Sequence, residues 1–403
     1  MKGGTTMQNG RRARGLIWLV LTLAVALALP WGTVGRAADP APATRWTVMG
    51  TPTRATITGG PWTLGQGPAT RAEPVVGYPT PNPGTQLFQP YYFPKTYGND
   101  QVIDGLFDYR PRNVEEQVVT AHSDDGGRSW TFTGQALRYL PSTTPDPENG
   151  NDDGQGHPYM IQIGNTQFLY TLDRQAGLKN VVGLNVRRFA DGHPFDLGPL
   201  PENETPPATT MQTTGLLNPD GIIDVIPGMQ PTTVMYLQKQ LGSVPIEDKV
   251  TLRLASTENG TDFTDLGAAT GILDKTTLFI GPRGTITRFD DGGQTRYGMF
   301  YSGGTLADDD SDAFHYIGYA ESTDLKTWTV VNGVDNPLLS RDKTDSAGGP
   351  QPWYEGRVYS PSVTFSADGK TATLVFAGYH TPKPKNDLGD YRTIGVVTLT
   401  RAQ

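Results

Sequence analysis

The sequence predicts an all-β protein built from one repeated unit, a five-bladed β-propeller, with six blades as the alternative. A Ser-x-Asp-x-Gly-x-Ser-Trp stretch ends at Trp130, and weaker copies end at Phe195, Phe263 and Trp328. These aromatic residues are 65, 68 and 65 positions apart, and a regular period of that size indicates one supersecondary unit used repeatedly. The 49 glycines and 33 prolines divide the chain into short segments. Those segments are rich in aromatic and β-branched residues, which is typical of strands, and none has the periodicity of a long amphipathic helix.

Each unit is expected to begin with a short strand that proline announces, followed by a second and a third strand. The five openings are Gln89-Pro90-Tyr91, His157-Pro158-Tyr159, Pro219-Asp220-Gly221, Gly281-Pro282-Arg283 and Ser360-Pro361-Ser362. The repeated turn and a fourth strand close the first four units, which places the blades at about 85–140, 150–200, 215–270, 278–335 and 355–400. Two packed β-sandwiches, the alternative architecture, would not explain a period near 65 residues.

The fifth unit reaches the end of the sequence after its third strand. We expect the N-terminal segment between residues 45 and 80 to supply the missing strand, from near 54–57 or 74–77. This closure would remove the free sheet edges that an open array of blades exposes.

The N-terminus has the pattern of an export signal. Arg11, Arg12 and Arg14 precede an unbroken apolar run over 16–29, which is too short for a comfortable membrane span. Small residues at Ala37 and Ala38 offer a cleavage site. We therefore expect a signal peptide over 1–38, a secreted protein and a single propeller domain over 39–403; a twin-arginine signal is the alternative export route.

The charge and the cysteine content exclude several classes of partner. Residues 39–403 contain 28 basic and 41 acidic residues, a net charge of −13. Such a chain is not expected to bind nucleic acid or an anionic membrane through its overall field. The sequence has no cysteine, so the secreted protein depends on its core rather than on disulfides. We expect a monomer.

The candidate site follows from the geometry of propellers, in which the first strands of all blades line one central channel. Residues at the start of each first strand, and loops between second and third strands, surround one mouth of it, a favourable place for a ligand. Three carboxylates from three blades, Asp153, Asp220 and Glu355, are the catalytic candidates. The candidates for substrate binding are Gln89, His157, Asp173, Arg174, Arg283, Arg357 and Tyr359. Asp108 lies in one of the loops between second and third strands.

A set of carboxylates converging on one cavity suits the hydrolysis of a glycosidic bond. One carboxyl group protonates the leaving oxygen, a second activates water or attacks the anomeric carbon, and a third orients the sugar or tunes the other two. Arg283 and Arg357 are suited to holding a carboxylate or to pairing with these acids.

Each candidate also has a structural interpretation. Asp153 lies in the acidic segment 146–154, which also fits a solvated turn or a calcium loop, and Asp220 lies in an Asn-Pro-Asp-Gly sequence that forms a β-turn by itself. Glu355 could be a structural partner of Arg357, and His157 fits a hydrogen-bonding role in the channel better than a metal ligand. We expect no cofactor, with a structural calcium ion as the open alternative here and in the acidic run 308–312.

The repeated stretch resembles the Asp-box of sialidases and other carbohydrate-active propellers. The resemblance implies that it forms the turn between the two outer strands of a blade and has a structural role. A second resemblance rests on the segments 299–303 (Met-Phe-Tyr-Ser-Gly), 317–322 (Ile-Gly-Tyr-Ala-Glu-Ser) and 324–328 (Asp-Leu-Lys-Thr-Trp). They are similar to one blade of the five-bladed glycoside hydrolases of families 43 and 32, which implies that fold and a carbohydrate substrate.

The catalytic motifs of these families are not matched. Family 43 enzymes carry an aspartate on the first inner strand, where this sequence has Gln89-Pro90. The Trp-Met-Asn-Asp-Pro motif of family 32 and the Arg-Ile-Pro start of sialidases are both missing. No catalytic assignment is therefore carried over from the resemblance.

The sequence thus predicts a secreted glycoside hydrolase that acts on an oligo- or polysaccharide, including furanosides such as arabinan. A sialidase-type enzyme, with Arg283 and Arg357 binding an acidic sugar, is the first alternative. The second is a non-catalytic carbohydrate-binding propeller, whose aromatic residues would stack on sugars. A lyase or another chemistry on the same scaffold is the remaining alternative, since a fold does not fix a function.

Overall fold

The computed structural model describes residues 45–58, 91–109, 117–137, 154–174, 183–189, 210–240, 250–273, 279–304, 314–341, 354, 357–379 and 392–402. The chain divides into two units, Met1–Ala41 and Pro42–Gln403, and every described residue lies in the second unit. The described regular elements are all strands. No helix long and apolar enough to cross a membrane occurs among these residues.

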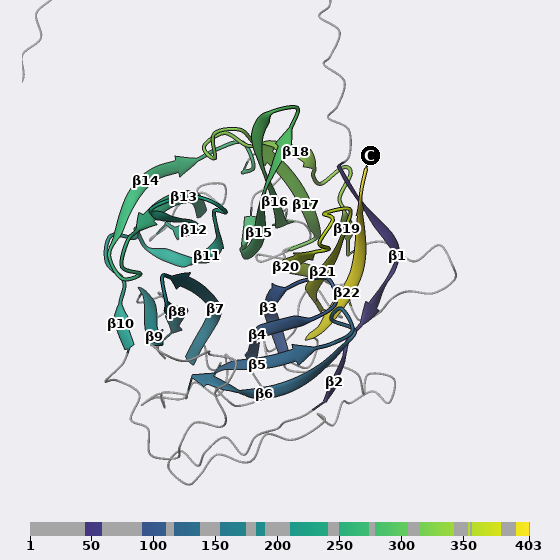
Figure 1. The fold of residues 1–403 in the computed structure, drawn as a ribbon, viewed down its shortest axis with the longest axis horizontal. Helices are drawn as coiled ribbons and strands as arrows, with labels where there is room; N and C mark the ends of the chain where they lie inside the picture. The colour runs from purple at the N-terminus through teal and green to yellow at the C-terminus, as the bar shows by residue number, and fades with distance from the viewer. Residues whose placement is uncertain are drawn as a thin grey trace, which may run out of the picture. The chain divides into compact units, whose positions relative to one another are not determined.

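The described strands form five sheets, each led by a strand that lies near a common centre (Figure 1). The first sheet contains β3 (Tyr91–Gly98), β4 (Ile103–Tyr109), β5 (Gln117–Ser123), β6 (Ser129–Leu137) and β2 (Thr56–Thr58). The second contains β7 (Gly154–Ile163), β8 (Thr166–Arg174), β9 (Gly183–Phe189) and β10 (Thr210–Gln212). The third contains β11 (Pro219–Val225), β12 (Thr232–Lys239), β13 (Val250–Thr257) and β14 (Phe263–Ala269).

The fourth sheet contains β15 (Phe279–Asp291), β16 (Gln294–Gly304), β17 (Tyr316–Ser322), β18 (Thr329–Asn332) and the short β19 (Leu339–Ser340), which pairs with β17. The last contains β20 (Arg357–Phe365), β21 (Thr371–Tyr379), β22 (Arg392–Arg401) and β1 (Trp46–Arg54). The predicted all-β fold and its propeller arrangement are confirmed.

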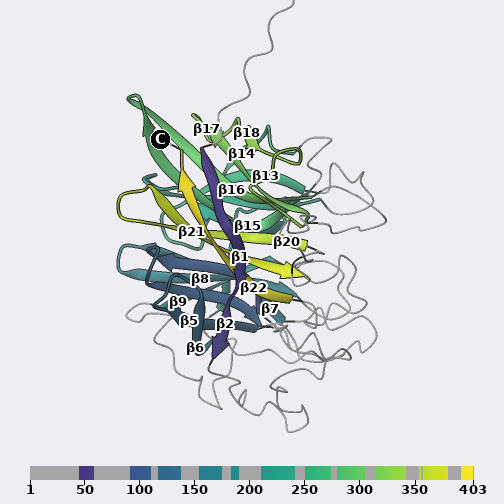
Figure 2. The same ribbon diagram turned by 90° about the vertical axis from the view of Figure 1, so that its right-hand side faces the viewer.

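The N-terminal strand links the last sheet to the first. β1 pairs antiparallel with β22, and after the single residue Ala55 the next strand, β2, pairs parallel with β6. Between them, the backbone N–H of Ala55 donates to the carbonyl oxygen of Ile394 at 2.9 Å. Figures 1 and 2 show this segment running outside β22 and on toward β6. One short stretch therefore covers the outer edges of two sheets, which would otherwise have exposed unpaired backbone groups.

Buried apolar residues fill the spaces between neighbouring sheets. The largest cluster joins the third and fourth sheets, and another joins the fourth and last sheets. Trp46, at the start of β1, is 3% exposed and belongs to the second of these clusters. Its ring centroid lies 5.8 Å from that of Phe300 and 5.7 Å from that of Phe365. The closing strand is thus anchored by aromatic packing as well as by its backbone hydrogen bonds.

Every inner strand is irregular where it enters the sheet. Its pairing with the second strand shifts register between Tyr92 and Lys95, Gly156 and Tyr159, Pro219 and Ile222, Ile280 and Gly284, and Tyr359 and Ser362. Proline cannot donate to a ladder, so bulges of this kind are where a strand accommodates it. The sequence places Pro90 at the opening of the first unit, but the proline inside the bulge is Pro94, three residues into β3.

The repeated turns share one hydrogen-bonding scheme. Asp125 Oδ1 accepts the N–H of Ser129 at 2.8 Å, and Asp324 Oδ1 accepts that of Thr327 at 2.7 Å. Trp130 and Trp328 then each donate an indole N–H to a carbonyl oxygen three residues earlier, at 2.9 and 3.0 Å. Burial raises the pKa of Asp125, but the hydrogen bonds that Ser129 donates to its carboxylate lower it. The pKa of Asp125 therefore lies below its ordinary value. These contacts stay within each turn, so they shape the hairpin rather than any site.

The copy of the turn that ends at Phe263 uses an asparagine where the other two described turns use an aspartate. Asn259 Oδ1 accepts the N–H groups of Thr261 and Asp262 at 3.0 and 2.9 Å. The N–H of Gly260 donates to Thr257 Oγ1 at 2.9 Å. An amide therefore replaces the carboxylate in this turn, and the Thr257 hydroxyl accepts the N–H that a serine accepts in the other two. The fourth, faintest copy lies beyond Phe189 and outside the described residues.

Replacing Trp46 with alanine is expected to destabilise the protein by about 3–5 kcal/mol, because it leaves a cavity between the last two sheets. Urea unfolding measures this loss. Met49→Ala is the matched control, since Met49 lies on the same strand but is 53% exposed and should change the free energy of unfolding by less than about 0.5 kcal/mol. Equal effects of the two substitutions would contradict the anchoring role of Trp46.

A pH dependence follows from His122 on β5. Its Nδ1 lies 2.7 Å from Asp104 Oδ1 and its Nε2 lies 3.0 Å from Asp124 Oδ1. The hydrogen bonds to Asp104 and then Asp124 raise the pKa of His122 above its ordinary value of 6.5. The raised pKa stabilises the folded state fully below the unfolded-state value near 6.5, and the effect is lost as pH rises through the folded-state pKa.

The measurement is the free energy of unfolding of the native chain and of His122→Gln at a series of pH values from 5 to 9. The advantage of the native chain over the variant should be largest at the acid end and should shrink as the pH rises above about 6.5. An advantage that does not vary with pH would show that His122 does not change its protonation with folding.

Candidate functional site

A closed ring of hydrogen bonds joins the five inner strands around the centre. Each inner strand donates one backbone N–H to a side chain of the inner strand before it. The donors and acceptors are Thr96 to Ser362 Oγ (2.8 Å), Met160 to Tyr97 OH (2.8 Å), Val225 to Tyr159 OH (2.8 Å), Ile286 to Asp224 Oδ2 (2.5 Å) and Val363 to Thr285 Oγ1 (2.9 Å). The ring fixes the height of each strand relative to its neighbours, because a one-residue slip would break two of its bonds.

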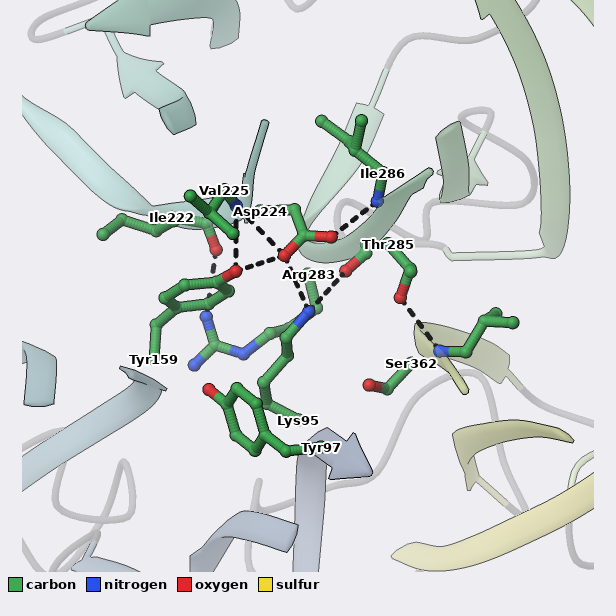
Figure 3. Close-up of polar contacts among 12 residues, drawn as sticks. Lys95, Tyr97, Tyr159, Ile222, Asp224, Val225, Arg283, Thr285, Ile286 and Ser362 are labelled. Atoms are coloured by element: carbon green, nitrogen blue, oxygen red, sulfur yellow. Dashed lines mark hydrogen bonds and ion pairs between the residues drawn. The ribbon is translucent and has the colours of Figure 1, made fainter. Parts of the chain in front are cut away.

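Each inner strand is an edge strand of its sheet, so alternate backbone N–H groups point away from that sheet. Beyond each bulge, one such N–H donates to the inner strand before it, and a neighbouring hydroxyl or carboxylate side chain accepts from the inner strand after it. Figure 3 shows the side chains of Tyr159, Asp224, Thr285 and Ser362 in this arrangement.

A buried ion pair crosses the ring. The Nζ of Lys95, on β3, lies 2.9 Å from the Oδ1 of Asp224, on β11. It also donates to the carbonyl oxygen of Gly284 at 3.3 Å (Figure 3). Both residues are about 5% exposed or less. Tyr159 donates its hydroxyl hydrogen to the same carboxylate oxygen in a short bond. Asp224 therefore receives an ammonium group, a phenol and two backbone N–H groups, those of Ile286 and Val225.

Burial shifts the pKa values of three groups in this cluster, Lys95, Tyr159 and Tyr97. Burial lowers the pKa of Lys95, while Asp224 acts in the opposite direction. Burial, with the charge of Asp224 next, raises the pKa of Tyr159 well above its ordinary value, and burial does the same to Tyr97. Both tyrosines thus stay neutral near pH 7 and act as hydrogen-bond partners. The buried groups of the cluster pair with one another and form one hydrogen-bonded network.

A second group of polar residues lies at the end of the five sheets where the inner strands begin, the mouth. Asp108, on β4 opposite Tyr92, is 0% exposed, and its Oδ2 accepts the backbone N–H of His157 at 3.0 Å. His157 Nδ1 lies 3.4 Å from the carbonyl oxygen of Asp220 on β11. Three neighbouring sheets thus meet at His157, through a carboxylate on one side and a peptide carbonyl on the other.

The backbone at this mouth is strained at matching places. His157, Asn218 and Ser360 have φ values of 52°, 40° and 54°, and each precedes a proline. Residues other than glycine rarely adopt a positive φ, and they keep it only where the surrounding structure holds them in that conformation. Here the Asp108 carboxylate holds the strained peptide of His157 directly.

The structure locates several of the predicted site residues. His157 and Asp220 lie together, as just described, whereas Arg283 lies close to Lys95 and Tyr97 of the central cluster. Arg283 is 0% exposed at the bulge of β15, and its Nη1 donates to the carbonyl oxygen of Ile222 on β11 at 3.2 Å (Figure 3). Tyr359 is buried on β20, and its ring stacks on that of Phe314 with centroids 5.7 Å apart and planes at 20°.

The other predicted site residues are placed only by their backbone or not at all. Arg357 is the first residue of β20, and Asp173 and Arg174 end β8, paired with the start of β7. These positions belong to the same end of the sheets as His157. Asp153, Glu355 and Gln89 lie outside the described residues, as does the acidic run 308–312.

Sequence reasoning missed the central cluster of Lys95, Asp224, Tyr159 and Tyr97. A signal was present, because Asp224 follows two isoleucines and precedes a valine within a strand that must be buried. A charge in such a run requires a partner. Lys95, after three aromatic residues and Pro94, is the matching case on β3. Within the described residues, no three His, Asp or Glu side chains gather in a way that could hold a metal ion.

Comparisons with known proteins support the fold. No family model matches the sequence, and no curated protein matches it. Among solved structures, a glycoside hydrolase superposes on this chain with a TM-score of 0.50 and 11% sequence identity. The superposition covers 77% of this chain and 92% of the glycoside hydrolase chain. An alpha-L-arabinofuranosidase from Lactobacillus brevis has a TM-score of 0.49 at 13% identity, covering 77% and 91%. An alpha-L-arabinofuranosidase from Podospora anserina in complex with cellotriose has a TM-score of 0.49 at 10% identity, and the match covers 82% of this chain and 95% of that enzyme's chain.

These similarities are similarities of fold. At such low identity, the first of them supports the propeller arrangement seen in the sheets and says nothing of the reaction. The site of this chain therefore has to be interpreted from its own residues.

Replacing Tyr159 with phenylalanine is expected to cost about 2–3 kcal/mol of stability, since it removes a hydrogen bond to a buried carboxylate and leaves the Val225 N–H without its phenol acceptor. Tyr170→Phe is the matched control. Tyr170 is equally buried, but its hydroxyl makes one neutral bond, to the Gly260 carbonyl at 2.7 Å, so it should cost about 1 kcal/mol. Urea unfolding measures both. A smaller loss for Tyr159→Phe than for Tyr170→Phe would show that the ring is not under this constraint.

Proposed function

We propose that this protein is a secreted glycoside hydrolase that acts on an oligo- or polysaccharide, furanosides such as arabinan included. The observation that carries the proposal is the junction of Asp108, His157 and Asp220 at one end of the channel, where three sheets present polar groups together. The similarity in fold to a glycoside hydrolase supports it. We further propose that each of the five sheets is one blade and that the repeated turns are Asp-boxes.

In this proposal the acid and base groups come from Asp220, Asp153 and Glu355. Asp220 lies on β11 at the mouth and is half-buried, a setting in which a carboxylate keeps access to a ligand. Asp108, being fully buried against the His157 backbone, acts as a positioning residue for the mouth. Hydrolysis then needs one carboxyl group to protonate the leaving oxygen and another to activate water or to attack the anomeric carbon.

The organisation around the site belongs to the same proposal. Residues 1–38 serve as a signal peptide, and residues 39–403 form one domain that works as a monomer on a carbohydrate substrate. The net charge of −13 for this domain fits a neutral sugar better than an anionic polymer.

The test is hydrolysis of a panel of aryl glycosides, plant and bacterial polysaccharides, and sialosides by the purified protein. Asp220→Asn, Asp153→Asn and Glu355→Gln are each expected to lower kcat by about 10²–10⁴-fold, because each removes an acid or a base from the transition state. Thermal unfolding of every variant shows whether it remains folded.

Two matched controls keep the same chemistry away from the channel mouth. Asp368→Asn changes an exposed aspartate in the turn between β20 and β21, and its replacement retains an acceptor for the Lys370 N–H. Glu258→Gln changes an exposed glutamate between β13 and β14. Both should keep full activity.

Three results would contradict the proposal in different ways. Undiminished hydrolysis by Asp220→Asn would remove that residue from the reaction. Turnover confined to sialosides, with weaker binding in Arg357→Ala, would favour a sialidase-type enzyme. Saturable sugar binding without turnover on any substrate would favour a non-catalytic binding protein.

A further inference from the structure

We propose that the ammonium group of Lys95 is the resident cation at the centre of the five sheets, held in a cation site that four inner strands build, β3, β7, β11 and β15, and that this site does not take a metal ion. The proposal concerns the centre of the channel, below the mouth, and does not depend on the reaction proposed above.

The groups around Lys95 Nζ form a cradle suited to an ammonium ion. Two oxygens lie within hydrogen-bond distance, Asp224 Oδ1 at 2.9 Å and the Gly284 carbonyl oxygen at 3.3 Å. The ring centroids of Tyr159 and Tyr97 lie 4.9 and 5.9 Å away (Figure 3). A carboxylate, a carbonyl and aromatic faces are the chemistry that recognises an organic ammonium group.

A metal ion does not suit this cradle. Calcium takes six to eight oxygens at about 2.3–2.6 Å, whereas the oxygens here stand at ammonium distances. The remaining acceptor capacity of Asp224 is already used by the N–H groups of Ile286 and Val225 and by the Tyr159 hydroxyl. Those two N–H groups belong to inner strands fixed by the ring, so they cannot withdraw to admit a metal. Magnesium, which demands near-ideal octahedral oxygen geometry, fits still less well.

The positive charge around the site also disfavours a metal ion. The charge of Arg283 acts on Lys95 as a second cation close to the site. A divalent ion would therefore join one or two fixed positive charges in a buried place, against one neighbouring carboxylate, Asp224. A single positive charge on a flexible stem satisfies that carboxylate without adding to the repulsion.

The proposal predicts that the site can be emptied and refilled. Lys95→Ala keeps Cβ and removes three carbons and the nitrogen, which is the composition of n-propylammonium. The variant should unfold at a temperature lower by about 5 °C or more, because the Asp224 carboxylate is left buried without its partner. Adding n-propylammonium chloride should restore a large part of that loss in a saturable way, since a ligand that binds only the folded state raises its stability.

The controls separate charge, shape and position. Sodium chloride at the same ionic strength tests screening, and 1-propanol tests a neutral molecule of similar shape; neither should stabilise Lys95→Ala as n-propylammonium does. Lys370→Ala removes an exposed lysine whose side chain is 74% exposed, and n-propylammonium should leave its unfolding temperature unchanged. Calcium chloride should stabilise Lys95→Ala less than n-propylammonium does.

Calcium stabilising Lys95→Ala more than n-propylammonium would overturn the proposal, because the cradle would then be a metal site. So would an unfolding temperature of Lys95→Ala equal to that of the native chain. If Lys95→Ala does not fold, the comparison of Lys95→Met with Lys95→Met/Asp224→Asn decides. The double variant should be the more stable, since it removes the unpaired charge, and a less stable double variant would count against the ion pair.

All of these readouts are measurements of stability. If the native protein hydrolyses none of the sugars tested, the proposed function is contradicted and this inference is not affected. A protein that hydrolyses sugars but fails the refilling experiment would do the reverse.

Discussion

The buried pair of Lys95 and Asp224 is the constraint on which the centre of this protein depends. A carboxylate this far from water is tolerated only when it is paired and hydrogen-bonded. Asp224 meets that condition by drawing on four inner strands: Lys95 from β3, Tyr159 from β7, its own neighbour Val225 on β11, and Ile286 from β15. The ion pair can therefore form only when these strands stand at one relative height, so it adds a directional constraint to the apolar packing and to the other hydrogen bonds between the sheets.

The same arrangement gives two levels of the inner strands different surroundings. Below the bulges, the ring and the ion pair fill the centre with satisfied groups. Above them, strained residues such as His157, held by Asp108, present polar side chains and peptide groups at the mouth. Arg283 links the two levels through its bond to the Ile222 carbonyl. A rigid floor of this kind suits a mouth whose polar groups must keep their positions while a ligand binds.

The sequence predicted the all-β propeller because its period and punctuation are properties of whole segments. The starts of the inner strands followed from the same register, so His157 and Asp220 at the mouth, and Arg283 near the central cluster, were named before their contacts were known. The ring could not be predicted in this way. Its bonds join residues about 60 to 270 positions apart, such as Val225 with Tyr159 and Thr96 with Ser362, and they depend on how far each bulge turns its strand. The role of Asn259 in one turn was also not predictable from the sequence pattern. Only the structure shows that its amide oxygen accepts the backbone N–H groups that an aspartate accepts in the other turns.

The most direct test of the central ring is native-state hydrogen exchange at its five backbone donors, the amides of Thr96, Met160, Val225, Ile286 and Val363. If the ring is the last part of the fold to open, all five amides should exchange only through global unfolding, with protection equal to that of the slowest amides in the middle strands of the sheets. Exchange of these amides well before those of the middle strands would show that the sheets hold together without the ring, and would contradict this account.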